Sequence, residues 1–160
     1  MNAWGNFFVA IVSAAAALTG LIFVGVSMSL SRILAIPTMP GRASESLILL
    51  VNALIVAALC LVPDQPIYWL GAEVLCINII VWIITTRIDL RILSKTDSQY
   101  KIHSIVNIVF TQAAVLPYFA AGIYMHTCGI CGLYWLIPGI LLSFVKAVQD
   151  AWVILVEIHR

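Results

Sequence analysis

Long apolar runs separated by short polar segments dominate the sequence. The first run, from Trp4 to Leu30, contains no charged side chain. At ~1.5 Å of rise per residue, it is long enough to cross the ~30 Å hydrocarbon layer of a bilayer as a helix. Its small residues recur at helical spacing on two flanks, which lets neighbouring helices approach closely. They are Ala10, Ala14 and Ala17 on one flank and Ala16, Gly20 and Gly25 on the other. We therefore expect a central transmembrane helix here.

Four further apolar segments follow, and each break between them contains proline, glycine or charged residues. Pro63 and Pro66 bound a connection that should be a tight reversal. The hydrophilic stretch from Arg87 to His103 ends the third segment, unless the helix continues through Arg91 before turning. The expected spans are 4–30, 43–62, 67–86, 102–125 and 133–156. The pattern predicts an all-α polytopic membrane helix bundle with five transmembrane helices, formed by one domain over 1–160.

Composition agrees with the membrane class. Hydrophobic residues make up 63% of the 160 residues and charged residues only 9%, far from the usage of soluble domains. The net charge is +1, and no cluster of lysine and arginine is interleaved with aromatic residues, which argues against nucleic-acid binding. The common nucleotide, esterase and zinc-protease signatures are absent. We therefore favour a non-enzymatic protein, although an enzyme built from an unfamiliar intramembrane constellation stays open.

Basic residues alternate between the ends of the expected spans. They lie in the first loop (Arg32, Arg42), in the third (Arg87, Arg91, Lys95, Lys101) and late in the last span or after it (Lys146, Arg160). The second and fourth loops have none. Because basic residues near span ends are retained in the cytoplasm, this pattern predicts an N-terminus outside and a C-terminus in the cytoplasm.

Polar side chains inside the spans are the candidates for function, because burying them in a bilayer is costly. Counted along the helix axes, Asn52, Asn78 and Gln112 fall at comparable depths, with Lys146 close to that layer and Thr19 a little beyond it. They would form one polar tier across the bundle. The tier is either a hydrophilic constriction or small-ligand site, or it joins helices by hydrogen bonds, which is the simpler interpretation.

Glu73 is expected about 10 Å inside the outer edge of the bilayer. It would relay protons or coordinate a cation, or it would form a hydrogen bond with a neighbour such as Tyr118 or reach toward the outer surface. Lys146 and Asp150 lie four residues apart and should pair on one helical face, unless Lys146 extends to the cytoplasmic headgroups. We expect Glu45 to be an interfacial acid near the start of its helix.

Four cysteines remain. Cys60 and Cys76 lie at different depths, so no bridge is expected between them. Cys128 and Cys131 form a C-x-x-C in the predicted outer loop, where three interpretations stay open: a structural disulfide or inert thiols, a thiol–disulfide exchange site, or a soft-metal site with His126. We treat the first as the default, because C-x-x-C alone is a weak signal.

Three segments carry a family resemblance. They read WGNFFVAIVSAAAALTGLIFVGVSMSLSRIL, PGRASESL and GLYWLIPGILLSFVKAVQDAWVILVEIHR. Together they resemble a group of small, uncharacterised integral membrane proteins of bacteria. The resemblance implies a bacterial cytoplasmic (inner) membrane setting, and it implies no activity and no site residue.

Three hypotheses for function follow. The first is a non-enzymatic bundle that forms a homo-oligomer or joins other membrane subunits. The second is an ion or proton channel or small transporter that uses Glu73 and the Asn52, Asn78 and Gln112 tier. The third is a membrane thiol–disulfide oxidoreductase that uses Cys128 and Cys131. No cofactor and no metal are predicted; the bound molecules to consider are membrane lipid and a quinone.

Overall fold

A computed structural model describes residues 2–96 and 101–158, and these ranges contain helices and connections but no strand. The elements are α1 (Asn2–Met28), α2 (Leu30–Ala35), α3 (Met39–Leu59), α4 (Ile67–Lys95), α5 (Lys101–Thr127) and α6 (Cys131–Ile158). Five of these helices are long and apolar enough to cross a membrane, as the sequence predicted. Arg160, which contributes to the predicted orientation, lies outside the described residues.

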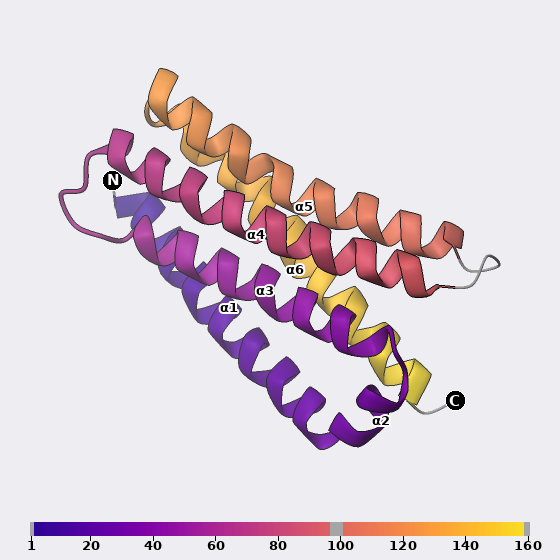
Figure 1. Cartoon of the computed structure of the whole chain (residues 1–160). Coiled ribbons are helices and arrows are strands. Elements are labelled where there is room, and N and C mark those ends of the chain that lie inside the picture. Colours follow the sequence, from indigo (N-terminus) through magenta and orange to yellow (C-terminus); the bar gives the residue numbers. More distant parts are fainter. Residues whose placement is uncertain (1, 97–100, 159–160) are drawn as a thin grey trace.

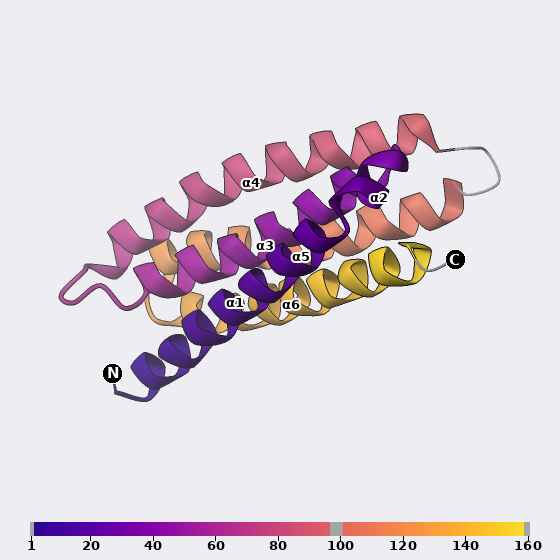
Figure 2. The same ribbon diagram turned by 90° about the horizontal axis from the view of Figure 1, so that it is seen from below.

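The five long helices run alongside one another as a bundle (Figures 1 and 2). Both views place the start of α1 and the end of α6 at opposite ends of the bundle. We call the end with the α3–α4 connection and the α5–α6 turn the disulfide end, because Cys128 and Cys131 lie there. The other end, which carries α2, is the α2 end.

The prediction that the first helix is central is wrong. The α3 helix is the most buried of the five, and it packs against α1, α4 and α6, whereas α1 is the least buried. The side chains that α1 buries include Phe8, Ile11 and Ala15, a row at helical spacing. All six small residues of the two predicted flanks are exposed. The helix therefore packs through its larger apolar row and leaves its small residues on the outside.

Several helix boundaries also differ from the prediction. The short helix α2 was not predicted, and α3 begins at Met39 because Pro40 occupies its first turn, where proline is well tolerated. The α4 helix continues to Lys95 instead of ending at residue 86. It remains amphipathic there, because Asp89 and Ile92 are buried while Arg87 is exposed. Its 29 residues make it ~43 Å long, more than the hydrocarbon layer alone requires.

Two connections close the disulfide end. The α3–α4 connection covers residues 60–66, longer than the predicted four residues, because α3 ends at Leu59. Asp64 adopts a left-handed conformation in it, with φ of 56°. The α5–α6 turn is shorter than expected, residues 128–130, and Gly129 supplies its positive φ of 68°. The helices α5 and α6 run through Pro117 and Pro138.

The half of the bundle nearer the disulfide end has an apolar core. Its buried side chains come from every long helix and include Phe8, Val56, Val74, Tyr118 and Leu136. Glycines allow close packing there: a Cβ atom built on Gly132 would lie 2.6 Å from the backbone nitrogen of Met125 and 2.7 Å from the carbonyl oxygen of Ala121. Thus α5 and α6 approach closely where they leave the turn.

Candidate functional site: a buried charged network

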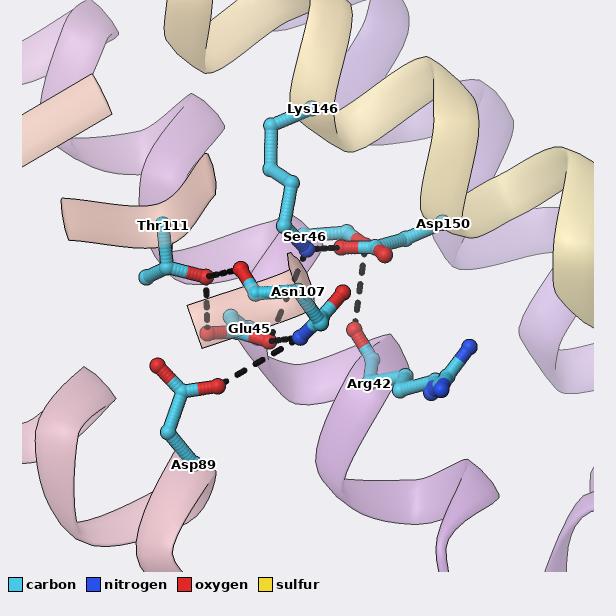
Figure 3. A network of polar contacts seen from close by, with 8 residues as sticks. All are labelled: Arg42, Glu45, Ser46, Asp89, Asn107, Thr111, Lys146 and Asp150. Atoms are coloured by element: carbon cyan, nitrogen blue, oxygen red, sulfur yellow. Dashed lines mark hydrogen bonds and ion pairs between the residues drawn. The ribbon is translucent and has the colours of Figure 1, made fainter. Parts of the chain in front are cut away.

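Four ionisable side chains are buried together in the half of the bundle nearer the α2 end (Figure 3). Glu45 comes from α3, Asp89 from α4, and Lys146 and Asp150 from α6, and each is at most 2% exposed. Charged side chains are rarely buried to this extent unless they are paired. This network is therefore the strongest candidate for a functional site.

Lys146 is the cation of the network. Its ammonium pairs with the Asp150 carboxylate one helical turn further along α6, and its Nζ atom lies 3.6 Å from Oε2 of Glu45. The Ser46 hydroxyl donates to Asp150 over 3.3 Å. The ammonium thus joins α6 to α3 at a point that lipid and solvent barely reach.

The α5 helix supplies neutral donors to the remaining carboxylate oxygens. The Thr111 hydroxyl donates to Oε1 of Glu45 over 2.8 Å. The Asn107 amide lies 3.3 Å from Oε2 of Glu45 and 3.4 Å from Oδ1 of Asp89, so it bridges the two acids. All four helices α3 to α6 therefore meet in one polar network, and α1 contributes nothing to it.

Negative charge exceeds positive charge in this network. Three carboxylates face one ammonium, and Oδ2 of Asp89 is buried without a hydrogen-bond partner among the described residues. Arg42 is a further cation, whose charge acts on Asp150 and whose guanidinium extends away from Glu45 and Asp89 in Figure 3. It forms no ion pair with the residues that the structure describes, and its Nε atom is buried without a hydrogen-bond partner. Fully ionised, the network would hold uncompensated charge in a medium that solvates it poorly.

Helical spacing explains how each element presents these groups. Glu45 and Ser46 follow Arg42 by three and four residues, Thr111 follows Asn107 by four, and Asp150 follows Lys146 by four. Residues three and four apart share one face of a helix. Each helix therefore turns a short polar stripe toward the others in an otherwise apolar setting.

A cavity of about 780 Å³ adjoins the network at the α2 end. The cavity shares part of its wall with the network, namely Asn107, Lys146 and Asp150. Arg42 lines the cavity beside them. Toward the disulfide end, beyond Asn52 and Ser143, the buried side chains that the structure describes are apolar apart from the Tyr118 hydroxyl. The network thus adjoins a cavity near the α2 end and meets apolar packing toward the disulfide end.

The structure adds to two expectations about these charges. Glu45, predicted to be an interfacial acid, is fully buried inside the bundle, where donors on α5 and the Lys146 ammonium on α6 contact both of its oxygens. Lys146 does not extend to the surface, because its two carboxylate partners hold it inside the bundle. The predicted pairing of Lys146 with Asp150 is present.

The predicted polar tier is divided among separate places. The Asn52 amide donates to Oδ1 of Asn78 over 3.0 Å, and both residues are buried. Gln112 instead accepts a hydrogen bond from the Trp82 indole and donates to Thr86, which lie four and eight residues beyond Asn78 on α4. Thr19 donates to the carbonyl of Ala15 in its own helix. The tier therefore does not line one common path.

Glu73 lies away from the network. It accepts a 2.6 Å hydrogen bond from Gln65, a residue of the α3–α4 connection, and is partly exposed. Tyr118, which was suggested as its partner, meets Ser143 instead at 3.3 Å. The described contacts thus connect Glu73 with the disulfide end only.

The cysteine pairing follows the default interpretation. Cys128 and Cys131 form a disulfide with a Cα–Cα distance of 5.5 Å, while Cys60 and Cys76 are free. The His126 ring packs edge-on against Tyr68, with the ring centroids 4.3 Å apart. Within residues 2–96 and 101–158, no group of three or more histidine, cysteine or acidic side chains could hold a metal ion.

Sequence reasoning missed Asp89, Asn107 and Thr111. Asp89 was not singled out, because it lies in the hydrophilic segment that follows Thr86. A signal was nevertheless available: Asn78, Thr85 and Asp89 follow one another at intervals of seven and four residues, which places them on one face of a continuous helix. Asn107 and Thr111 carry the same four-residue interval.

The chain matches no protein-family model, no curated protein and no solved structure. The geometry of the network and of its cavity is therefore the basis for the functional argument.

Proposed function

We propose that the protein is a non-enzymatic multi-pass membrane protein that binds and releases protons at Glu45, Asp89 and Asp150 from one side of the membrane. The observation that carries this proposal is the burial of three carboxylates around one ammonium, next to a cavity that opens at one end. Intramembrane acids are costly to retain, and they commonly mark proton relays or ion pathways.

A proton is better suited than a metal ion to neutralise the excess negative charge of this network. Hard cations require several oxygen ligands arranged around them. Here hydrogen-bond donors from Asn107, Thr111 and Lys146 already surround the oxygens of Glu45, and these donors would repel a cation. A proton needs only one free oxygen, and Oδ2 of Asp89 is buried and accepts no hydrogen bond from the residues that the structure describes. Asp89 is therefore the first residue to which we assign proton binding.

The proposed setting is the cytoplasmic membrane of a bacterium, with the α2 end in the cytoplasm. Arg42, Arg87 and Lys95 belong to the segments near this end, and basic residues favour the cytoplasmic side. The resemblance of the opening and closing segments to small bacterial membrane proteins supports the same assignment. Protons would then reach the network from the cytoplasm.

Infrared difference spectroscopy of the protein in lipid tests the proposal, because protonated carboxyl groups absorb separately from carboxylates. Wild type should gain this absorption reversibly as the pH falls, and Asp89→Asn should lose a large part of the change. Glu73→Gln, which neutralises an acid outside the network, should retain it. The proposal fails if the wild-type spectrum shows no carboxyl change while the protein stays folded, or if only Glu73→Gln removes it.

A second candidate function, assembly with further copies of the chain, is favoured by the outer surface of α1. Its small residues are exposed, and a Cβ atom built on Gly20 or Gly25 meets no atom within 4 Å. Exposed small residues let a second helix approach closely in a membrane. Mass measurement in native-like lipid should give an oligomer that Gly20→Leu weakens. A wild-type monomer at all protein concentrations would remove this candidate.

A further inference from the structure

The cavity beside the charged network combines basic side chains with apolar walls. Arg42, Lys95 and His103 lie on it, each from a different helix or helix end. Val106 and Phe110 of α5 and Trp152 and Val153 of α6 supply its apolar wall. With a volume of about 780 Å³, it lies in the size range of small-molecule sites and is larger than a proton pathway requires.

The cavity lies where two helices separate. Figure 1 shows α5 and α6 diverging toward the α2 end, and the cavity is lined by residues from both. Val106 and Trp152 are 58% and 66% exposed, so the rim contributed by these helices is apolar and accessible from the side of the bundle. In a membrane, this side faces lipid chains, and a tryptophan near the end of a span is typical of the headgroup level.

The charges inside the cavity favour an anion. Among the described residues that line the cavity, Asp150 is the acid, and it is already paired with Lys146. The Nε donor of Arg42 is buried and meets no acceptor in the described part of the chain, and the guanidinium extends away from Glu45 and Asp89 in Figure 3. A guanidinium binds phosphate oxygens well through two parallel hydrogen bonds, and Lys95 adds a second positive charge.

We propose that this cavity binds an anionic phospholipid, with the phosphate at Arg42 and Lys95 and an acyl chain between α5 and α6. A soluble phosphate compound would use the same cations but would leave the apolar wall of Val106, Phe110 and Trp152 uncovered. Basic pockets between transmembrane helices bind lipid headgroups in this manner. The inference does not depend on proton binding, because Asp89 does not line the cavity.

Native mass spectrometry of the purified full chain tests the site with phosphatidylglycerol and phosphatidylcholine of identical acyl chains. Wild type should retain phosphatidylglycerol preferentially. Arg42→Gln combined with Lys95→Gln should weaken this retention on the order of tenfold, because each basic residue near a headgroup contributes appreciably to binding. Arg87→Gln removes one positive charge outside the cavity, as the matched control for Lys95→Gln alone, and should bind like wild type.

Further measurements distinguish binding of a lipid from binding of free phosphate, and loss of binding from loss of the fold. Inorganic phosphate should not displace phosphatidylglycerol, and Val106→Trp, which narrows the apolar opening, should weaken lipid retention. Lys95→Gln alone, at an exposed helix end, gives a folded variant if the double substitution does not fold, and it should still weaken retention. Equal retention of both lipids, displacement by inorganic phosphate, or equal losses in Arg87→Gln and the cavity variants would each overturn the inference. Asp89→Asn should still bind phosphatidylglycerol. Loss of lipid binding in this variant would also contradict the inference.

Discussion

Glu45 of α3 and Lys146 of α6 lie 3.6 Å apart, carboxylate oxygen to ammonium nitrogen, and neither is more than 1% exposed. This ion pair joins the second and the last of the long helices. Asp150 pairs with the same ammonium, and Asn107 links Glu45 to Asp89. The Glu45–Lys146 pair is therefore the link between the two acids Glu45 and Asp89 and the Lys146–Asp150 pair of α6. The arrangement is thus sensitive to the loss of any single partner.

Replacement of Lys146 by methionine should destabilise the bundle. It leaves Glu45 and Asp150 buried without their cation, and loss of one partner from a buried ion pair costs about 3 kcal/mol or more. Reversible unfolding in bicelles or detergent measures this loss. Lys95→Met, at an exposed helix end, should change the free energy of unfolding by less than about 0.5 kcal/mol.

A double variant tests whether the destabilisation comes from the interaction between Lys146 and Asp150 or from the loss of each side chain by itself. Lys146→Met combined with Asp150→Asn removes both partners, so its destabilisation should be smaller than the sum of the two single losses. Additive losses would show that Lys146 and Asp150 do not interact in the folded protein.

Gly132→Ala should disrupt the close approach of α5 and α6. The new Cβ atom would lie 2.5 Å from Cγ and 2.6 Å from the backbone nitrogen of Met125, so the helices have to move apart. Overpacking of this kind costs about 1–3 kcal/mol. Gly5→Ala is the matched control, because a Cβ atom there also meets nothing within 4 Å. Equal unfolding temperatures for both variants would contradict this packing.

The disulfide should protect two of the four cysteines from alkylation. In protein prepared without reductant and denatured with the disulfide intact, a maleimide should modify Cys60 and Cys76 only. After reduction, Cys128 and Cys131 should react as well. Mass spectrometry of the labelled protein counts the additions. Four additions before reduction would show that the pair is not bonded in the isolated protein.

Hydrophobic periodicity was sufficient to predict the five long helices, because length and composition alone determine which segments can cross a bilayer. The pairing of Lys146 with Asp150 was predictable too, since the four-residue interval fixes their shared face. Both inferences use properties of one helix at a time.

Relations between helices were harder to predict. Distance along the axis gave similar depths for Asn52, Asn78 and Gln112, but the rotation of each helix decides which side chains meet. Gln112 faces Trp82 and Thr86, whereas Asn52 faces Asn78. The predicted central position of α1 was wrong for a related reason. Small residues permit close packing, but they do not show whether a neighbouring helix is present.

Asp89 was missed because a charged residue after an apolar run suggests the end of a span. In the structure, neighbouring arginines lie on the outer side of the same helix while Asp89 faces the network. Burial of this acid depends on partners from α3 and α5, which no local pattern in α4 reveals. Sequence reasoning therefore identified the cation and two acids of the network, Asp150 and Glu45, but not its full composition.

Sidedness of proton binding is the decisive measurement. The protein can be sealed into vesicles in one orientation, which is assigned by reduction of Cys128–Cys131 with an impermeant reductant. The pH is then stepped on one face while the infrared carboxyl absorption is followed. We predict a prompt response to a step at the α2 end and a much slower one to a step at the disulfide end, with both much reduced in Asp89→Asn. An equally prompt response from both faces, or an unchanged response in Asp89→Asn, would contradict a one-sided proton site in this network.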